Sequence, residues 1–171
     1  MARIRKFKAY QNLERPYTRI SKFTKKNFVR GGRPNMKIIK FEMGNSQGKF
    51  DSMLMLTSKK SMNIRHNALE SARMTSNRLL EKTLLKAYHL KIKVYPFHVL
   101  RENPLAAGAG ADRMSTGMKK SFGKVIGCAA RVKEGQTLIE VRVNKEHVRV
   151  AREALQRAAK KFPCSCKIVT G

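Results

Sequence analysis

The chain has 171 residues, the length of one ordinary domain, and 42% of them are hydrophobic, which is enough for a core. Its 38 lysines and arginines against 11 aspartates and glutamates leave a net charge of +27, which predicts a polyanionic partner, with nucleic acid the first candidate and an anionic membrane the alternative. The composition argues against a membrane-spanning protein, a secreted protein and a disulfide scaffold, because there is no apolar run of roughly 20 residues, no apolar segment after the basic start and only three cysteines. We therefore expect a cytoplasmic protein that binds a polyanion.

Residues 1–34 predict an extended basic arm. They contain eleven cations, one acid and five aromatic residues, and prolines and glycines at positions 16, 31, 32 and 34 interrupt any helical or alternating period. Such a segment has no core of its own, so we expect it to be disordered alone and to fold on a polyanion; a solvated tail is the alternative. Its candidate RNA-binding residues are Arg3, Arg5, Lys6, Lys8, Arg15, Arg19, Lys22, Lys25, Lys26, Arg30 and Arg33.

Residues 35–171 predict a single α+β domain that begins with two strands, a helix and a third strand. Partial alternation at 37–43 and a short apolar run at 52–57 indicate strands, which should pair as neighbours. Asn63 is expected to cap a helix that runs to about Tyr88. A strand follows at 91–100, where Pro96 implies a bulge or a sheet edge.

The second half of the domain predicts a hairpin, a helix and a last strand. Residues 123–132 and 137–143 resemble strands around a turn, so they are expected to pair with each other. Asn144 is expected to cap a helix that Pro163 ends, before a strand at 166–169. The apolar residues of this helix follow at helical spacing: Ala151, Ala154, Leu155, Ala158 and Phe162. The order of elements favours a two-layer sandwich with both helices on one face of a mixed or antiparallel sheet.

Between these halves, residues 101–120 form a long loop rich in small residues. Gly108 and Gly110 suggest a dinucleotide-binding fingerprint, but Arg113 replaces its third glycine, and Lys124 lacks the following Ser or Thr of a phosphate-binding loop. We interpret the loop as a slim finger whose backbone can approach a partner closely; a hairpin tip without function is the alternative. Its cations, which could bind phosphates, are Arg101, Arg113, Lys119, Lys120 and, just beyond it, Lys124.

No catalytic or metal-binding constellation is expected, so the chain is predicted to be a binding protein and not an enzyme. Cys164 and Cys166 could join Cys128 and a histidine around zinc, but the spacing favours buried free cysteines. His66 and His147 are expected to make local hydrogen bonds. Cations on the helices could add phosphate contacts or form a solvated face. They are Arg65, Arg73, Arg78, Lys82, Lys86, Arg149, Arg152, Arg157, Lys160 and Lys161.

Five segments resemble one known family, in order and over essentially the whole chain. They are MARIRKFKAY, ERPYTRISKF, NIRHNALESAR, ENPLAAGAGADRMSTGMKKSFGK and KFPCSCKIV. The family is the archaeal and eukaryotic form of universal large-subunit ribosomal protein sixteen, also named ribosomal protein ten-e. The resemblance implies a two-layer α+β fold and a non-catalytic protein of the large ribosomal subunit. It would lie between the central protuberance and the peptidyl transferase centre. The rival interpretations are a ribosome-free RNA-binding protein or RNA chaperone, and an RNA-modifying enzyme.

The resemblance also implies the partners, which are large-subunit rRNA near the 5S rRNA, tRNA and neighbouring large-subunit proteins, without a cofactor, a metal or a membrane. In the family, the loop that matches residues 101–120 reaches toward tRNA acceptor ends near the P site, and the protein joins the subunit late in assembly. The residues expected to bind rRNA are the arm cations together with Arg65 and Arg73. Those expected to face tRNA are Arg101, Ala107, Gly108, Ala109, Gly110, Asp112, Arg113, Lys119 and Lys120.

Overall fold

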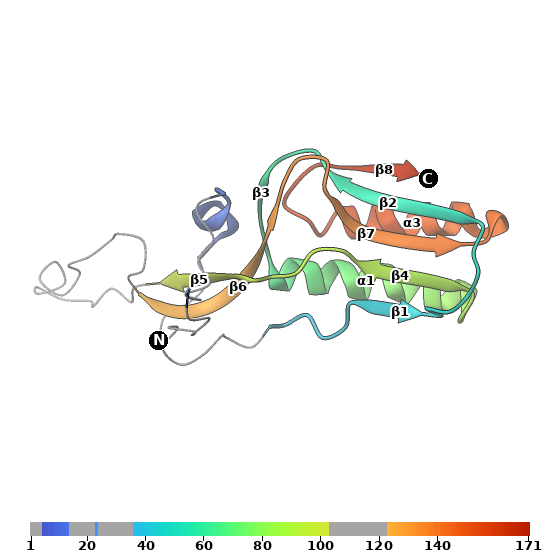
Figure 1. The fold of residues 1–171 in the computed structure, drawn as a ribbon, viewed down its shortest axis with the longest axis horizontal. Coiled ribbons are helices and arrows are strands. Elements are labelled where there is room, and N and C mark those ends of the chain that lie inside the picture. Colours follow the sequence, from blue (N-terminus) through green and yellow to red (C-terminus); the bar gives the residue numbers. More distant parts are fainter. Residues whose placement is uncertain (1–4, 14–22, 24–35, 103–122) are drawn as a thin grey trace, which may run out of the picture.

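The computed structural model describes residues 5–13, 23, 36–102 and 123–171. Within them the chain forms two antiparallel sheets and two α-helices (Figure 1). No helix in this described part is long and apolar enough to cross a membrane. In chain order the elements are η1 (Phe7–Tyr10), β1 (Glu42–Gly44), β2 (Ser52–Ser58), β3 (Met62–Arg65), α1 (His66–Leu84), β4 (Tyr88–Ile92), β5 (His98–Glu102), β6 (Lys124–Val132), β7 (Thr137–Val143), η2 (Lys145–His147), α3 (Val148–Ala159) and β8 (Cys166–Thr170).

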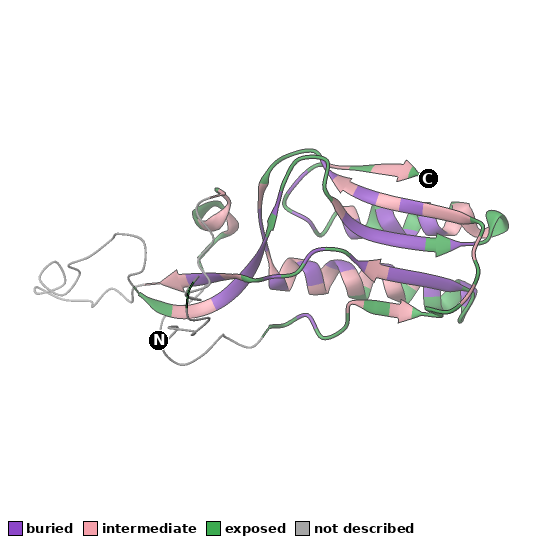
Figure 2. Ribbon diagram, viewed as in Figure 1, coloured by how far each residue is buried: buried purple, intermediate pink, exposed green. Residues whose placement is uncertain are grey.

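The larger sheet has five strands in the order β1-β4-β7-β2-β8, and α1 and α3 pack side by side on one of its faces (Figure 1). In β2, Leu54, Leu56 and Ser58 are buried and alternate with partly exposed residues, because successive side chains of a strand point to opposite faces. α3 buries Ala154 and Leu155 completely, and it contacts β2, β7, β8 and α1. Figure 2 shows the buried stretches along β4 and β7, in the middle of the sheet. These layers confirm the predicted α+β fold.

The smaller sheet has three strands in the order β3-β6-β5, so the hairpin predicted from residues 123–143 does not form. β6 pairs with β3 and β5, whereas β7 pairs with β2 and β4 in the larger sheet. The turn between β6 and β7 bonds to Ser58 instead, because Gly135 N–H donates to Ser58 O at 2.8 Å and Ser58 N–H donates to Gln136 O at 3.0 Å. An apolar pattern determines which face of a strand is buried but leaves the neighbouring strand undetermined.

Three other predicted strands or helix starts differ from the structure. Residues 62–65, expected at the start of a helix, form β3, and α1 begins at His66. Of the strand expected at 37–43, only its end belongs to β1, which pairs with β4 and not with β2. The strand expected at 91–100 is divided into β4 and β5, which lie in different sheets. The division includes Pro96, which has no N–H to donate to a neighbouring strand.

Neither asparagine expected to cap a helix does so. Asn63 lies inside β3, opposite Arg131 of β6. Asn144 precedes the short 3-10 helix η2, and its side chain makes no capping hydrogen bond. α3 ends at Ala159, before Pro163, and buries four of the five apolar residues predicted for it, whereas Phe162 is buried just after its end. The periodicity therefore located the buried side of this helix, whereas the capping signal did not locate its start.

Candidate nucleic-acid interface

Residues 5–13 of the predicted basic arm are folded and docked on the smaller sheet. Its short helix η1 lies beside β3, an edge strand of that sheet. Asn63 of β3 is 3% exposed, and its backbone N–H donates to Gln11 O at 3.0 Å. Its side-chain amide donates to Tyr10 O at 3.1 Å and to Asn12 O at 2.7 Å. Residues 10–12 thus bond to the outer edge of β3, the edge that does not face β6. This corrects the expectation of an arm extended throughout.

Glu102, the last residue of β5, ties this segment to the base of the predicted finger loop. Its carboxylate forms an ion pair with Arg5 and accepts a hydrogen bond from the Tyr10 hydroxyl, with 2.8 Å between the oxygens. Arg5 in turn donates its backbone N–H to the Tyr10 hydroxyl at 3.2 Å, and its carbonyl accepts a bond from Arg65 at 2.8 Å. The Glu102 side chain is only 10% exposed. We call Arg5, Tyr10 and Glu102 the arm–loop anchor.

Burial and the neighbouring carboxylate keep the anchor tyrosine protonated. The pKa of Tyr10 is raised, first because burial penalises the phenolate and then because of the bond to Glu102, although the backbone N–H of Arg5 opposes the change. The hydroxyl therefore acts as a donor to a carboxylate, a pairing stronger than one between neutral groups. The anchor positions the arm and the loop base relative to each other.

The other predicted rRNA-binding residues differ in whether their charge is exposed to an RNA partner or paired inside the domain. Lys6 and Lys8 are exposed beside the anchor. Arg73 instead donates to both oxygens of Glu70, at 2.9 Å and 2.6 Å, with both side chains 14% exposed. That hydrogen bond holds the pKa of the Glu70 carboxyl below its ordinary value. Arg73 is thus largely neutralised inside the domain, and Lys6 and Lys8 are the better-placed cations.

Most of the predicted contact residues lie outside the residues that the structure describes. From the arm these are Arg3, Arg15, Arg19, Lys22, Lys25, Lys26, Arg30 and Arg33. From the loop they are Ala107, Gly108, Ala109, Gly110, Asp112, Arg113, Lys119 and Lys120. Arg101 is described: it lies in β5, opposite Val125 of β6, and is partly exposed.

The cations predicted on the helices are mostly exposed. Arg157 pairs with Glu153 one turn away, at 2.7 Å, with about half of each side chain exposed. A surface pair of this kind contributes little to stability, so the face remains open to a polyanion. The exposed members are Arg78, Lys82, Lys86, Arg149, Arg152, Arg157, Lys160 and Lys161.

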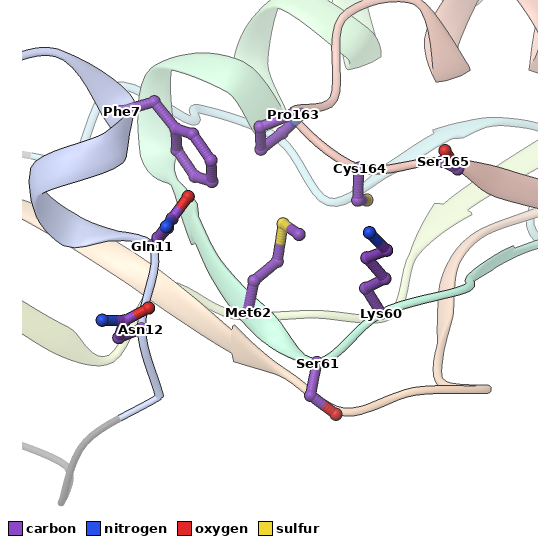
Figure 3. A pocket seen from close by; sticks show the side chains of 9 residues that line it. All are labelled: Phe7, Gln11, Asn12, Lys60, Ser61, Met62, Pro163, Cys164 and Ser165. Carbon is purple, nitrogen blue, oxygen red and sulfur yellow. The ribbon is translucent and has the colours of Figure 1, made fainter.

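A cavity of about 400 Å³ lies where η1 approaches the β2–β3 and α3–β8 connections (Figure 3). Phe7, Met62 and Pro163 form its apolar lining, while Gln11 and Lys60 add polar groups. In the described residues, no group of three or more histidines, cysteines, aspartates or glutamates could hold a metal ion. The cavity therefore offers a mixed surface beside the docked arm, and its lining includes no carboxylate or imidazole for acid–base chemistry.

Two of the three cysteines lie close together at one side of this cavity. Cys164 is buried and Cys166 half-buried, with 3.7 Å between their sulfurs. The hydrogen bond between them lowers the pKa of Cys164 and raises that of Cys166, and the Ser58 hydroxyl also bonds to Cys164 at 3.6 Å. Cys128 is buried in β6 of the other sheet. The structure thus brings together two of the cysteines weighed as zinc ligands but not a third.

The buried histidines have structural roles. His66 opens α1, is 3% exposed, and its Nδ1 accepts a bond from Lys37 N–H at 3.3 Å, as expected of a local hydrogen-bonding residue. Burial is the main cause that lowers its pKa, with Lys37 and Arg65 adding to it. His89 is 6% exposed in β4, and burial lowers its pKa as well. Both rings are therefore neutral near pH 7, which suits a core more than a phosphate contact.

Sequence reasoning missed Glu102 and Asn63 as the residues that organise this region. Glu102 is an acid at the edge of a cationic loop, and that contrast of charge is the signal that could have identified it. Asn63 resembled a helix cap because a helix does begin three residues later. Their partners lie in a segment far away in the sequence, so no local pattern could identify them.

The chain is similar over most of its length to known proteins. A family model described as ribosomal protein L16p/L10e matches residues 18–169. Large ribosomal subunit protein uL16 of Staphylothermus marinus is 51% identical over 158 residues, covering 91% of this chain and 90% of that protein. The proteins of the same name from Methanococcus maripaludis and Archaeoglobus fulgidus are each 44% identical, over 97% and 94% of this chain and over 93% and 88% of those proteins.

Proposed function

The chain belongs to the ribosomal protein L16p/L10e family, and from this premise we propose that it is a structural, non-enzymatic constituent of the large ribosomal subunit. It would act in the cytoplasm as part of that subunit. The net charge of +27 supports this proposal, because folded rRNA supplies the phosphates that neutralise such a chain. Each neutralised phosphate releases counterions, so binding should weaken as salt rises.

The observation that carries the proposal furthest is the arm–loop anchor. Tyr10 and Arg5 meet Glu102 at the end of β5, so this part of the basic arm lies beside the base of the predicted finger loop. β5 and β6 extend beyond the larger sheet at one end of the molecule (Figure 1). The domain would thus present basic residues 5–8 and the base of the finger loop at one end, where they could meet folded RNA.

We also propose the finer roles that the family resemblance suggested. The arm cations, with Arg65 and in part Arg73, bind large-subunit rRNA in the vicinity of the 5S rRNA. The loop at 101–120 reaches tRNA acceptor ends near the peptidyl transferase centre, where its small residues allow close approach and Arg101, Arg113 and the lysines contact phosphates. Neighbouring large-subunit proteins complete the partners.

Sedimentation in a sucrose gradient tests the main proposal. The full chain should co-sediment with large subunits and stay bound in moderate salt; a chain that remains at the top of the gradient would instead support a ribosome-free RNA-binding protein. Lys6→Ala with Lys8→Ala should release the chain at lower salt, because each lost phosphate contact changes the salt dependence by roughly one unit of slope. Lys160→Ala with Lys161→Ala removes the same charge from the end of α3 as a matched control.

A deletion in the loop tests the finer role. Removing residues 106–116 should leave the chain on the subunit but weaken binding of tRNA to subunits that carry the variant. If the deletion abolishes folding, the loop is structural. If tRNA binds normally to such subunits, the tRNA-facing role is wrong while the constituent role stands.

A further inference from the structure

We propose that Phe41, Tyr95 and Phe97, which we call the aromatic row, form a platform on which unpaired RNA bases stack. The inference rests on the proposed function, because it assumes RNA as the partner. It concerns a surface away from the arm–loop anchor, formed by the segment before β1 and by the connection between β4 and β5.

The three rings lie one after another. The centroids of Phe41 and Tyr95 are 4.6 Å apart with an interplanar angle of 35°, and those of Tyr95 and Phe97 are 5.8 Å apart with an angle of 22°. Both separations fall in the range of attractive aromatic pairs. Phe41 is partly buried against the core, whereas Tyr95 is 44% and Phe97 54% exposed. The row is thus held by the core at one end and exposed to solvent at the other.

The backbone keeps these rings in place before any partner arrives. Along residues 93–97, Val94 and Pro96 are buried while Lys93, Tyr95 and Phe97 are exposed, and the ring contact places Tyr95 and Phe97 side by side. Pro96 fixes its own φ, and Phe97 N–H donates to Tyr95 O at 3.0 Å. The segment that carries Phe41 is fastened by the bond from Ile92 N–H to Phe41 O, at 2.8 Å. Because the rings are already held in place, binding of a partner to the aromatic row would cost little conformational entropy.

The charge around the row favours RNA over a protein partner. Lys37 and Lys40, in the segment that carries Phe41, are exposed, and so is Lys93, two residues before Tyr95. The Lys93 side chain is 42% exposed, although Glu140 lies 3.5 Å from its ammonium group. Rings interleaved with cations suit unpaired nucleotides, whose bases stack on the rings while their phosphates meet the lysines. A protein contact would favour a broader apolar patch with fewer charges.

Double-stranded RNA would not stack on these rings, because its bases are already paired and stacked on each other. The inference therefore predicts a preference that charge alone cannot give. Cations attract single strands and duplexes alike, whereas exposed rings add affinity only for bases that are free to stack.

The experiment measures binding of the full chain to one short unstructured RNA and to its duplex, at the same moderate salt. Tyr95→Leu with Phe97→Leu should weaken single-strand binding about 5- to 150-fold, the range for one stacked base, and leave duplex binding unchanged. Phe97→Leu alone, at the exposed end of the row, should give a smaller loss in the same direction. Tyr95→Phe keeps the ring, and Ile39→Ala removes an apolar side chain that is 75% exposed; neither should change single-strand affinity.

Each other outcome overturns the inference in a recognisable way. Equal losses on both probes would mean that the variants act through folding, which circular dichroism checks, and not through stacking. Unchanged single-strand affinity would refute stacking while the proposed function stands. If Ile39→Ala lowers incorporation into subunits and the aromatic variants do not lower RNA affinity, the surface contacts a protein. A wild-type chain that binds neither RNA contradicts the proposed function itself.

Discussion

The arm–loop anchor predicts that Tyr10 and Glu102 stabilise the docked arm cooperatively. The variants are Tyr10→Phe, Glu102→Ala and the two together. Tyr10→Phe removes the hydroxyl that donates to Glu102 at 2.8 Å and accepts from Arg5 N–H at 3.2 Å. Glu102→Ala removes the same acceptor and also the ion pair with Arg5. If the anchor acts as one unit, the double variant should lower the free energy of arm docking by less than the sum of the two single effects.

The structure sets the size of each effect. A hydrogen bond to a charged group contributes about 1.5–3 kcal/mol when buried, and the half-exposed surroundings of Tyr10 place this one near the lower end. The ion pair contributes at most about 1 kcal/mol, since 53% of the Arg5 side chain is exposed. We therefore expect the docking of residues 5–13 to be weakened by about 1–2 kcal/mol in Tyr10→Phe and by about 2 kcal/mol in Glu102→Ala. The coupling energy between the two residues should be about 1–2 kcal/mol.

Native-state hydrogen exchange at the Asn63 amide is the assay, because this N–H donates to Gln11 O of the docked segment. Undocking of residues 5–13 exposes the amide without unfolding the sheets, so its exchange reports the local free energy of opening. Tyr10→Phe should speed the exchange about 5- to 30-fold. Amides in the centre of β2 should keep their rates and serve as the internal reference.

Two results would refute the reasoning. One is an Asn63 exchange rate that Tyr10→Phe leaves unchanged. The other is additivity of the two single effects within about 0.5 kcal/mol, which is what independent sites give. Glu153→Ala is the matched control, because it removes a carboxylate paired with Arg157 on the exposed face of α3 and should not affect Asn63.

Two further predictions concern the folded domain. Gly44→Ala should lower the free energy of unfolding by about 2–4 kcal/mol and Gly135→Ala by only about 1 kcal/mol: both have positive φ, but an added Cβ at Gly44 would lie 2.1 Å from Tyr88 O, whereas nothing lies within 4 Å at Gly135. If urea titrations show the same loss of unfolding free energy for both variants, the close contact at Gly44 does not add to the cost of its substitution. The free energy of unfolding should also fall as pH drops below about 6.5, because burial lowers the folded-state pKa of His66 and His89, so the unfolded chain takes up the protons first. Each histidine can contribute at most about 1.4 kcal/mol per pH unit, and His66→Gln should reduce the slope between about pH 7 and pH 5.5; an unchanged slope would show that His66 is not responsible.

Local pattern predicted those parts of the fold in which one side of an element is buried. The short apolar run at 52–57 became β2, and the helical spacing of Ala151, Ala154 and Leu155 located the buried side of α3. Such periodicities reflect burial of a face, which neighbours in the sequence encode directly. For the same reason the α+β class followed from the order of the elements.

Local sequence patterns could not predict which strands pair or which residues hold the arm in place. β6 and β7 are consecutive and apolar, yet each pairs in a different sheet, β6 with β3 and β5 and β7 with β2 and β4. The turn between them also bonds to β2, through Gly135 and Gln136 to Ser58. Asn63 was taken for a helix cap, although its side chain holds Tyr10 O and Asn12 O. The candidate site was predicted as a set of cations, whereas the acid that organises its described part was missed.

By itself, the sequence determined the charge of the protein, the class of its fold, its family and the kind of partner it needs, since composition and short motifs carry these properties. The tertiary structure alone decided that two sheets form, that the arm begins as a docked segment and that three aromatic rings meet in a row. Tyr10 and Glu102 are separated by 92 residues, as Phe41 and Tyr95 are far apart in the chain. Their contacts depend on how whole elements pack, because closing so long a loop is favourable only when many other contacts form with it.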